Sequence, residues 1–255
     1  MCFELDSRPP VAPIAGGALD SQRLTLAAAD GTRYSAFRAH AAEPSGAGMI
    51  VLPDVRGLHT YYEELALRFA EAGIDAIAID YFGRTAGLAP RGQGFEFMPH
   101  VGQLSYDAGV SDIRRAAEEL RRDGRVRALF TVGFCLGGRL AFLTPTMNLD
   151  IAGAIGFYGW PTGPHRSGSP APAEVAGQMR GAVLGIFGGA DQGINGGVVE
   201  EFGRALAEAE VEHDLITYPG APHSFFDRTA EAFAVQSADA WQKVLTFVRQ
   251  HTPTP

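Results

Sequence analysis

The stretch Thr131-Val132-Gly133-Phe134-Cys135-Leu136-Gly137-Gly138 decides how the rest of the chain is interpreted. An apolar run typical of a strand, residues 128–132, stops at Gly133, and a helical pattern begins just after Leu136. Cys135 therefore falls on the turn between a strand and a helix. The pattern G-x-C-x-G at such a turn predicts a nucleophile elbow, with cysteine in place of the more usual serine. Glycines at both ends allow strand and helix to approach closely, because they carry no Cβ atom.

The elbow has a chemical consequence for Cys135. A side chain on this turn is expected above the sheet at the N-terminus of a helix, where unpaired N–H groups and the helix dipole favour thiolate over thiol. Two other interpretations stay open from these residues alone. A lone cysteine is commonly a buried core residue, and glycine-rich turns between strand and helix also bind phosphate groups.

Length and composition set the broad class of protein. The chain has 255 residues, of which 46% are hydrophobic, enough for a full core. We expect an N-terminal arm over 1–22 and a single domain over 23–255. The formal net charge of −8, without a basic tract, makes nucleic acid and anionic membranes poor partners. A small-molecule substrate remains, and the oligomeric state stays open.

The cysteines and the N-terminal segment indicate the cellular setting. Cys2 and Cys135 are far apart in the sequence and belong to no C-x-x-C motif, so neither a disulfide framework nor a zinc site is predicted. The first residues lack the basic and apolar regions of a signal peptide, and no apolar run reaches membrane-spanning length. We expect a soluble cytoplasmic protein that uses neither a metal nor an organic cofactor.

Hydrophobic patterns along the chain predict an α/β fold. Two strand-like runs, 24–29 and 34–39, flank Asp30-Gly31, a strong signal for an antiparallel hairpin. Further strands are expected at 49–52, 74–79, 128–132, 151–158, 182–187 and 214–218, separated by helical patterns. This alternation predicts a mostly parallel sheet that is covered by helices on both faces.

Three residues with complementary chemistry directly follow apolar strands. They are Cys135, Asp191 and His223, and their order along the chain is nucleophile, acid and histidine. Neutral imidazole can take the proton of a thiol near pH 7, and a carboxylate can orient the imidazole. Taken singly, Asp191 could be a helix cap and His223 a loop residue. Together they predict a catalytic triad, and we interpret the other histidines as bystanders, although His59 and His165 could approach the mouth of the site.

Acyl transfer also requires donors for the developing oxyanion. The backbone N–H of Leu136, the residue after the predicted nucleophile, is one candidate. We expect the second from the loop that follows the strand ending at Pro53, and predict the N–H of Val55.

Three motifs, Gly-Phe-Cys-Leu-Gly-Gly at 133–138, Gly-Gly-Ala-Asp at 188–191 and Pro-His-Ser-Phe at 222–225, resemble the dienelactone hydrolase family. The likeness extends from about residue 24 to the last predicted helix. It implies an α/β-hydrolase fold and carboxymethylenebutenolidase-like chemistry. In that chemistry a cysteine attacks an ester carbonyl, an acyl-thioester forms, and water releases the acid.

The resemblance also assigns further site residues. A family glutamate that engages the resting thiol corresponds to Asp54, which is one methylene shorter. Of two arginines that hold the carboxylate of the lactone, the first corresponds to Arg84, whereas Arg228 lies one residue after the position of the second. Phe82 and Trp160 are further candidates for contact with substrate.

Two alternatives to a dienelactone-type hydrolase remain. In the first, the loops at 83–94 and 159–181 shape a different pocket, and the enzyme is a broader esterase or thioesterase. In the second, the protein binds ligands or senses oxidation through Cys135 without catalysis. An acid at Asp191 argues against the second, because a sensor has no need of it.

Overall fold

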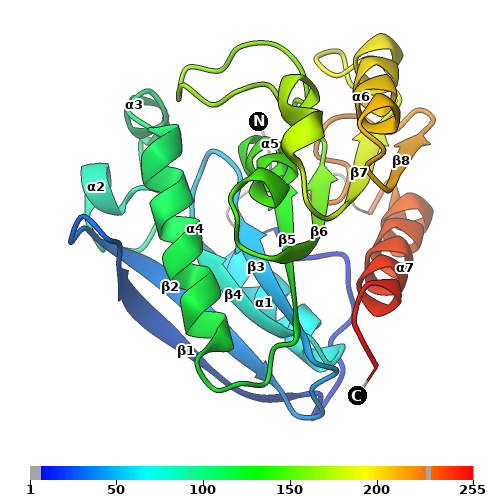
Figure 1. The fold of residues 1–255 in the computed structure, drawn as a ribbon. Coiled ribbons are helices and arrows are strands. Elements are labelled where there is room, and N and C mark those ends of the chain that lie inside the picture. The colour runs from blue at the N-terminus through cyan, green and yellow to red at the C-terminus, as the bar shows by residue number, and fades with distance from the viewer. Residues whose placement is uncertain (1–6, 93, 228–230, 255) are drawn as a thin grey trace.

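Eight strands form one sheet in the computed structural model, which describes residues 7–92, 94–227 and 231–254 (Figure 1). Their order across the sheet is β1-β2-β4-β3-β5-β6-β7-β8. Their bounds are β1 (Ala18–Ala27), β2 (Arg33–Ala41), β3 (Ala47–Leu52), β4 (Asp75–Ile79), β5 (Ala128–Phe134), β6 (Ile151–Phe157), β7 (Ala182–Gly188) and β8 (His213–Tyr218).

The predicted α/β-hydrolase fold is confirmed. Strands β1 and β2 form the antiparallel hairpin, and β2 pairs antiparallel with β4. All other pairings, β4 with β3, β3 with β5, and so on to β8, are parallel. The hairpin is longer than its hydrophobic pattern indicated. Strand β1 begins at Ala18, so residues 18–22, which we assigned to an N-terminal arm, belong to the sheet. A single domain over 23–255 stays a prediction.

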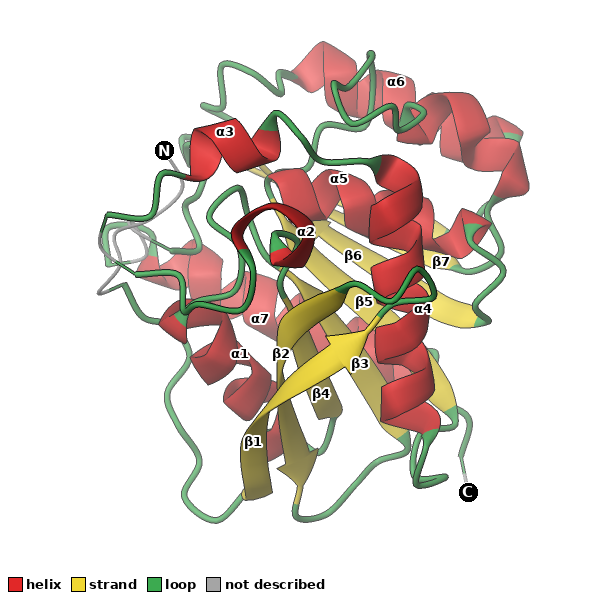
Figure 2. Cartoon of the chain, turned by 90° about the vertical axis from the view of Figure 1, so that its left-hand side faces the viewer, coloured by secondary structure: helices red, strands yellow, loops and turns green. Residues whose placement is uncertain are grey.

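Helices cover both faces of the sheet (Figure 2). The bounds are α1 (Thr60–Glu71), α2 (Gly83–Ala86), α3 (Phe97–Val101), α4 (Tyr106–Arg121), α5 (Leu136–Leu143), α6 (Gly196–Glu208) and α7 (Ala234–Gln250), with 3₁₀ turns η1 (Thr144–Thr146) and η2 (Pro172–Gln178). In the part of the chain that the structure describes, no helix combines the length and apolar character that crossing a bilayer requires.

The core follows from the two-residue period of the strands. In β3, Met49 and Val51 join the apolar cluster that includes α1 and α7, whereas Ile50 and Leu52 join the cluster that includes α4. Successive side chains of a strand point to opposite faces, so α1 and α4 lie on opposite sides of the sheet. Strands buried on both faces explain why β3, β4 and β5 are almost continuous apolar runs.

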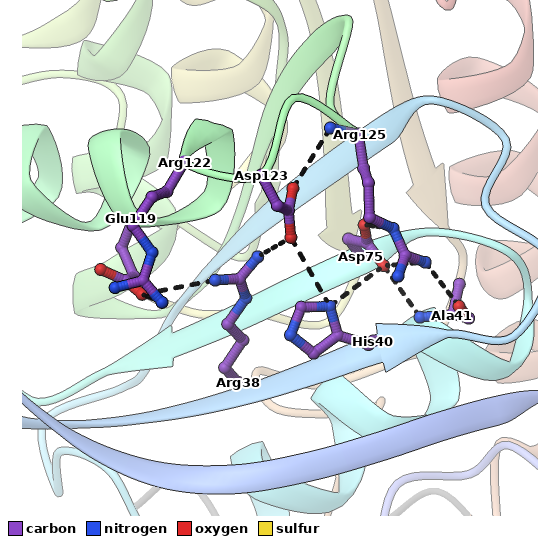
Figure 3. Close-up of polar contacts among 8 residues, drawn as sticks. All are labelled: Arg38, His40, Ala41, Asp75, Glu119, Arg122, Asp123 and Arg125. Carbon is purple, nitrogen blue, oxygen red and sulfur yellow. Dashed lines mark hydrogen bonds and ion pairs between the residues drawn. The ribbon is translucent and has the colours of Figure 1, made fainter.

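A buried network of charges lies at the edge of the sheet where β4 begins (Figure 3). The Arg38 guanidinium, whose side chain is 2% exposed, donates to Glu119 at 3.3 Å and to Asp123 at 2.7 Å. Asp75 accepts from the N–H of Ala41 at 2.8 Å and pairs with Arg125 at 3.1 Å. These contacts join β2, β4 and the end of α4 at the edge opposite the carboxyl ends of the parallel strands.

We predict that Arg38→Met lowers the free energy of unfolding by about 3 to 5 kcal/mol, because removing one member of a buried ion pair leaves its partners uncompensated. Arg122→Met is the matched control, since Arg122 pairs with the same Glu119 at 3.1 Å but its side chain is 69% exposed. The control is expected to cost less than about 1 kcal/mol. Urea unfolding of both variants tests this, and equal losses would contradict it.

Candidate active site

Cys135 occupies the turn between β5 and α5, where the sequence places it. Its φ of 56° and ψ of −112° lie outside the regions that non-glycine residues ordinarily adopt. Its N–H donates to the carbonyl oxygen of Phe157 at 3.0 Å, which fixes the turn to the neighbouring strand β6. The residue is 7% exposed, so the thiol is largely buried but not sealed within the core.

Two glycines make this turn possible. A Cβ atom at Gly133 would overlap the carbonyl group of Gly137, the second residue of α5. A Cβ atom at Gly137 would overlap the carbonyl oxygens of Leu52 and Pro53 at the end of β3. Strand β5, helix α5 and the end of β3 therefore meet at backbone contact distance.

Three of the six non-glycine residues with positive φ among the described residues lie at the carboxyl edge of the sheet, Cys135 being one of them, and the other three are Asn148, Asp150 and Glu210. Positive φ values also occur at Tyr158, directly after β6, with 40°, and at Ser224, directly after His223, with 63°. Non-glycine residues in such conformations persist only where the surrounding structure holds them, and they gather at functional sites. The strained backbone at Cys135, Tyr158 and Ser224 therefore supports this edge of the sheet as the candidate active site.

Asp191 and His223 come together at the ends of β7 and β8. The Nδ1 of His223 lies 2.6 Å from Oδ2 of Asp191, while Oδ1 of Asp191 accepts from the N–H groups of Gly193 and Ile194 at 2.8 and 3.2 Å. Burial alone would raise the pKa of Asp191, but these hydrogen bonds and the charge of His223 outweigh it and hold the pKa below the ordinary 3.8. Asp191 is therefore an anion at neutral pH, and it orients the imidazole.

A cavity of about 480 Å³ opens beside Cys135. The two predicted oxyanion donors, Val55 and Leu136, line it together with Cys135. Leu136 is the first residue of α5, so its N–H has no carbonyl partner within the helix. Trp160 lines the same cavity, and its ring centroid lies 5.0 Å from that of His223. The structure thus gathers the predicted catalytic and oxyanion residues at one edge of the sheet.

The loop after β3, which carries Asp54 and Val55, is tightly held. The N–H of Asp54 donates to the Tyr62 hydroxyl at 2.9 Å, and Asp54 Oδ1 accepts from the N–H of Arg56 at 2.9 Å. The Tyr81 hydroxyl donates to the carbonyl oxygen of Pro53 at 2.9 Å. Burial raises the pKa of Tyr81 well above 10, and the charges of Asp54, Asp80 and Cys135 add to this effect. The role predicted for Asp54 stays a prediction.

The other predicted substrate contacts are placed differently. Arg84 lines an adjoining, smaller cavity of about 70 Å³, which shares Leu136, Arg139 and His165 with the cavity of Cys135. Its guanidinium contacts Asp112 at 2.6 Å and Asp30 at 3.1 Å. Burial raises the pKa of Asp112 to about 6, against the opposing effect of Arg84. Phe82 is fully buried against Phe95 and does not line the cavity of Cys135. Arg228 lies outside the described residues.

Of the two histidines expected near the mouth, only His165 lines the cavity of Cys135. His59 lines a third cavity of about 240 Å³, and burial together with the charge of Arg56 lowers its pKa to about 3. Its ring is therefore neutral at physiological pH.

Five residues that line the cavity were not predicted from the sequence: Val101, Arg139, Thr162, Pro164 and Arg166. Arg139 follows Cys135 by one helical turn, a spacing that could have suggested it. Arg166 lies in an irregular loop and carries no such signal. Among the described residues, no cluster of three or more His, Cys, Asp or Glu side chains has the geometry to hold a metal ion.

Comparison with known proteins defines the family. The family model described as "Dienelactone hydrolase family" matches residues 36–252. The chain belongs to this family. Members of the dienelactone hydrolase family are hydrolases, and the α/β-hydrolase fold of this chain agrees with that membership.

Individual relatives share a quarter to a third of their residues with this chain. A Yersinia pestis protein named "Putative carboxymethylenebutenolidase" is 30% identical over 207 residues, which cover 80% of this chain and 78% of the relative. A Bradyrhizobium protein named "Probable 2-oxo-3-(5-oxofuran-2-ylidene)propanoate lactonase" is 27% identical over 234 residues, covering 87% and 92%. The crystal structure of a "Putative Dienelactone Hydrolase" from Klebsiella pneumoniae superposes with a TM-score of 0.78 at 25% identity, covering 91% and 99%.

We predict that Gly133→Ala lowers the free energy of unfolding by at least about 4 kcal/mol, because the added methyl group meets backbone that cannot move aside. Gly109→Ala is the control. Its Cβ atom would meet only Leu140, at 3.9 Å, and the change is expected to stabilise α4 by about 0.5 to 1 kcal/mol. Denaturant unfolding measures both, and a mild effect at Gly133 would argue against the close approach.

Proposed function

We propose that the protein is a cysteine-dependent hydrolase of small esters or lactones that acts through an acyl-thioester intermediate. The observation that supports this most directly is the meeting of two features at one edge of the sheet. These are the strained turn of Cys135 and the 2.6 Å contact between Asp191 and His223. Together they provide a nucleophile, a base and an acid that orients the base.

In the first half-reaction, the Cys135 thiol gives its proton to Nε2 of His223 as the sulfur attacks the carbonyl carbon. Asp191 holds the other ring proton at Nδ1, which leaves Nε2 as the basic nitrogen. A C–S bond forms, and the carbonyl electron pair moves onto oxygen. The N–H groups of Leu136 and Val55 stabilise that oxyanion. The carbonyl then re-forms, the C–O bond of the ester breaks, and His223 protonates the leaving oxygen.

In the second half-reaction, water replaces the sulfur. His223 takes a proton from water as its oxygen attacks the thioester carbonyl, and the same two N–H groups bind the second oxyanion. Collapse breaks the C–S bond, the thiolate regains its proton from His223, and the carboxylic acid is released. In a lactone the leaving oxygen stays attached to the acid, so a single ring-opened product results.

The preferred substrate is a small lactone that bears a carboxylate, of the dienelactone type. The Bradyrhizobium relative is named for a lactone substrate with a propanoate group, which supports this choice of class. Arg84 is the predicted carboxylate anchor. To bind the carboxylate of the substrate, its guanidinium gives up its contact with Asp112 or with Asp30.

A second candidate function is that of a broader esterase, and the contacts of Arg84 favour it. The charge of Arg84 is already compensated by two carboxylates, and its side chain lines the neighbouring cavity rather than that of Cys135. A site without a dedicated anchor would accept neutral esters as readily as anionic ones.

The central prediction concerns Cys135. Cys135→Ala is expected to lower turnover of dienelactone and of aryl esters by at least about 1,000-fold, because the nucleophile is lost. Iodoacetamide labelling of the unmodified protein as a function of pH, run in parallel, reports the ionisation of the thiol. Turnover that survives the substitution would contradict the mechanism. Normal labelling without turnover of any ester would instead favour a thiol-based binding or redox role.

The two candidate functions differ in their response to Arg84→Ala. For a carboxylate anchor, the substitution raises KM for an anionic lactone by about tenfold or more, since a charge-assisted hydrogen bond is lost, and leaves a neutral aryl ester unchanged. Arg127→Ala is the control, because Arg127 donates to the backbone carbonyls of Ser45 and Pro253 and lines neither cavity. Equal changes in KM for both substrates would favour the broader esterase.

A further inference from the structure

Arg139 is a buried arginine on helix α5, 3% exposed, in the wall of the Cys135 cavity. All five of its N–H donors are used, and every acceptor belongs to the segment 160–170. Nε donates to the Ser169 hydroxyl at 3.1 Å, Nη1 to the carbonyl oxygens of Trp160 and Thr162 at 3.1 Å each, and Nη2 to those of Gly163 at 2.8 Å and Pro170 at 2.9 Å.

The charge of Arg139 is held without an ion pair. Within the described ranges, no carboxylate lies at ion-pair distance from its guanidinium, and burial lowers its pKa against the opposing, more distant charge of Glu174. Carbonyl dipoles therefore compensate the charge. Such a set of acceptors fits a planar guanidinium with five donors, and lysine, with three donors at one point, cannot satisfy it.

The segment 160–170 depends on these contacts for its shape. It follows β6 and contains neither helix nor strand, so no ladder of backbone hydrogen bonds holds it. Figure 1 shows it as a yellow-green loop at the top of the molecule. Other hydrogen bonds of its backbone include those from the N–H of Tyr106 to Ser167 and from the N–H of Ala173 to Pro161, both at 2.9 Å. Arg139 therefore ties the interior of the loop to α5.

The same segment forms one wall of the candidate active site. Trp160, Thr162 and Pro164 line the cavity of Cys135. Trp160 also lies against both partners of the acid–base pair, since its ring faces His223 at 5.0 Å and a Cβ atom at Gly193, on the Asp191 turn, would overlap it.

We propose that Arg139 is a positioning residue, which holds the segment 160–170 against α5 and thereby places Trp160 and the cavity wall where an ester can be bound. Its effect on turnover rests on the proposed function, whereas its effect on the position of Trp160 does not. Asp191 holds His223 independently, so the thiol and its base are expected to keep their arrangement when Arg139 is replaced.

The test uses Trp160 as a probe. The chain has two tryptophans, Trp160 and Trp241, so Trp241→Phe leaves Trp160 as the single fluorophore. In that background, Arg139→Lys is expected to make Trp160 markedly more accessible to acrylamide. KM for esters large enough to fill the cavity rises, and kcat/KM falls by up to about 100-fold, since small displacements of binding groups are costly. The rate of Cys135 alkylation by iodoacetamide, a small reagent, stays within about twofold of the parent.

Two further variants complete the design. Arg180→Lys is the matched control, because Arg180 also donates to backbone carbonyls, those of Gly177 and Met179, but does not line the cavity. It is expected to change none of the three measurements. Ser169→Ala removes one acceptor from the loop side, and should shift quenching and KM in the same direction by less. This variant keeps the test available if Arg139→Lys folds poorly.

Unchanged quenching and KM in Arg139→Lys would overturn the proposal. Loss of alkylation together with turnover would also overturn it, because Arg139 would then act on the thiol rather than on the wall. If the parent protein hydrolyses no ester, the proposed function fails, whereas the quenching measurement still decides whether Arg139 positions Trp160.

Discussion

The close approach of β5 and α5 is the constraint on which the candidate active site depends. Because Gly133 and Gly137 bring backbone against backbone, the chain reverses direction within about one residue, and Cys135 takes a positive φ of 56°. This strained turn places the thiol beside two features at once, the first N–H of α5 and the loop after β3. The strain costs on the order of 1 to 3 kcal/mol for such a residue, and the packed core on both faces of the sheet offsets it.

The other parts of the site are delivered by the sheet rather than by local sequence. Parallel strands end at a common edge, so Asp191 after β7 and His223 near β8 come within 2.6 Å although they are separated along the chain. The two edges of the sheet differ in chemistry. At the edge where β4 begins, paired and buried charges join β2, β4 and the end of α4 (Figure 3). The opposite edge carries strained backbone and a cavity.

Features that depend on local pattern could be predicted from the sequence, and features that depend on distant partners could not. Apolar runs and glycines specified the strands, the hairpin and the turn at Cys135, because their signals lie within a few residues. The ion pairs of Arg84 could not be predicted in this way, because their carboxylates come from distant parts of the chain, Asp30 from the hairpin turn and Asp112 from α4. Arg139 was missed for another reason: its partners are mostly backbone carbonyls, which every residue possesses and no motif records.

The arginines of this region show why residue type alone does not define a binding site. Arg84 and Arg139 both lie near the carboxyl edge of the sheet, and the side chains of both are largely enclosed, yet carboxylates compensate the first and carbonyl dipoles compensate the second. A guanidinium whose donors are all satisfied has little to gain from a substrate unless an existing contact breaks. The charge selectivity of the cavity therefore depends on the difference between two sets of contacts, and on the desolvation of the anion, rather than on the number of arginines nearby.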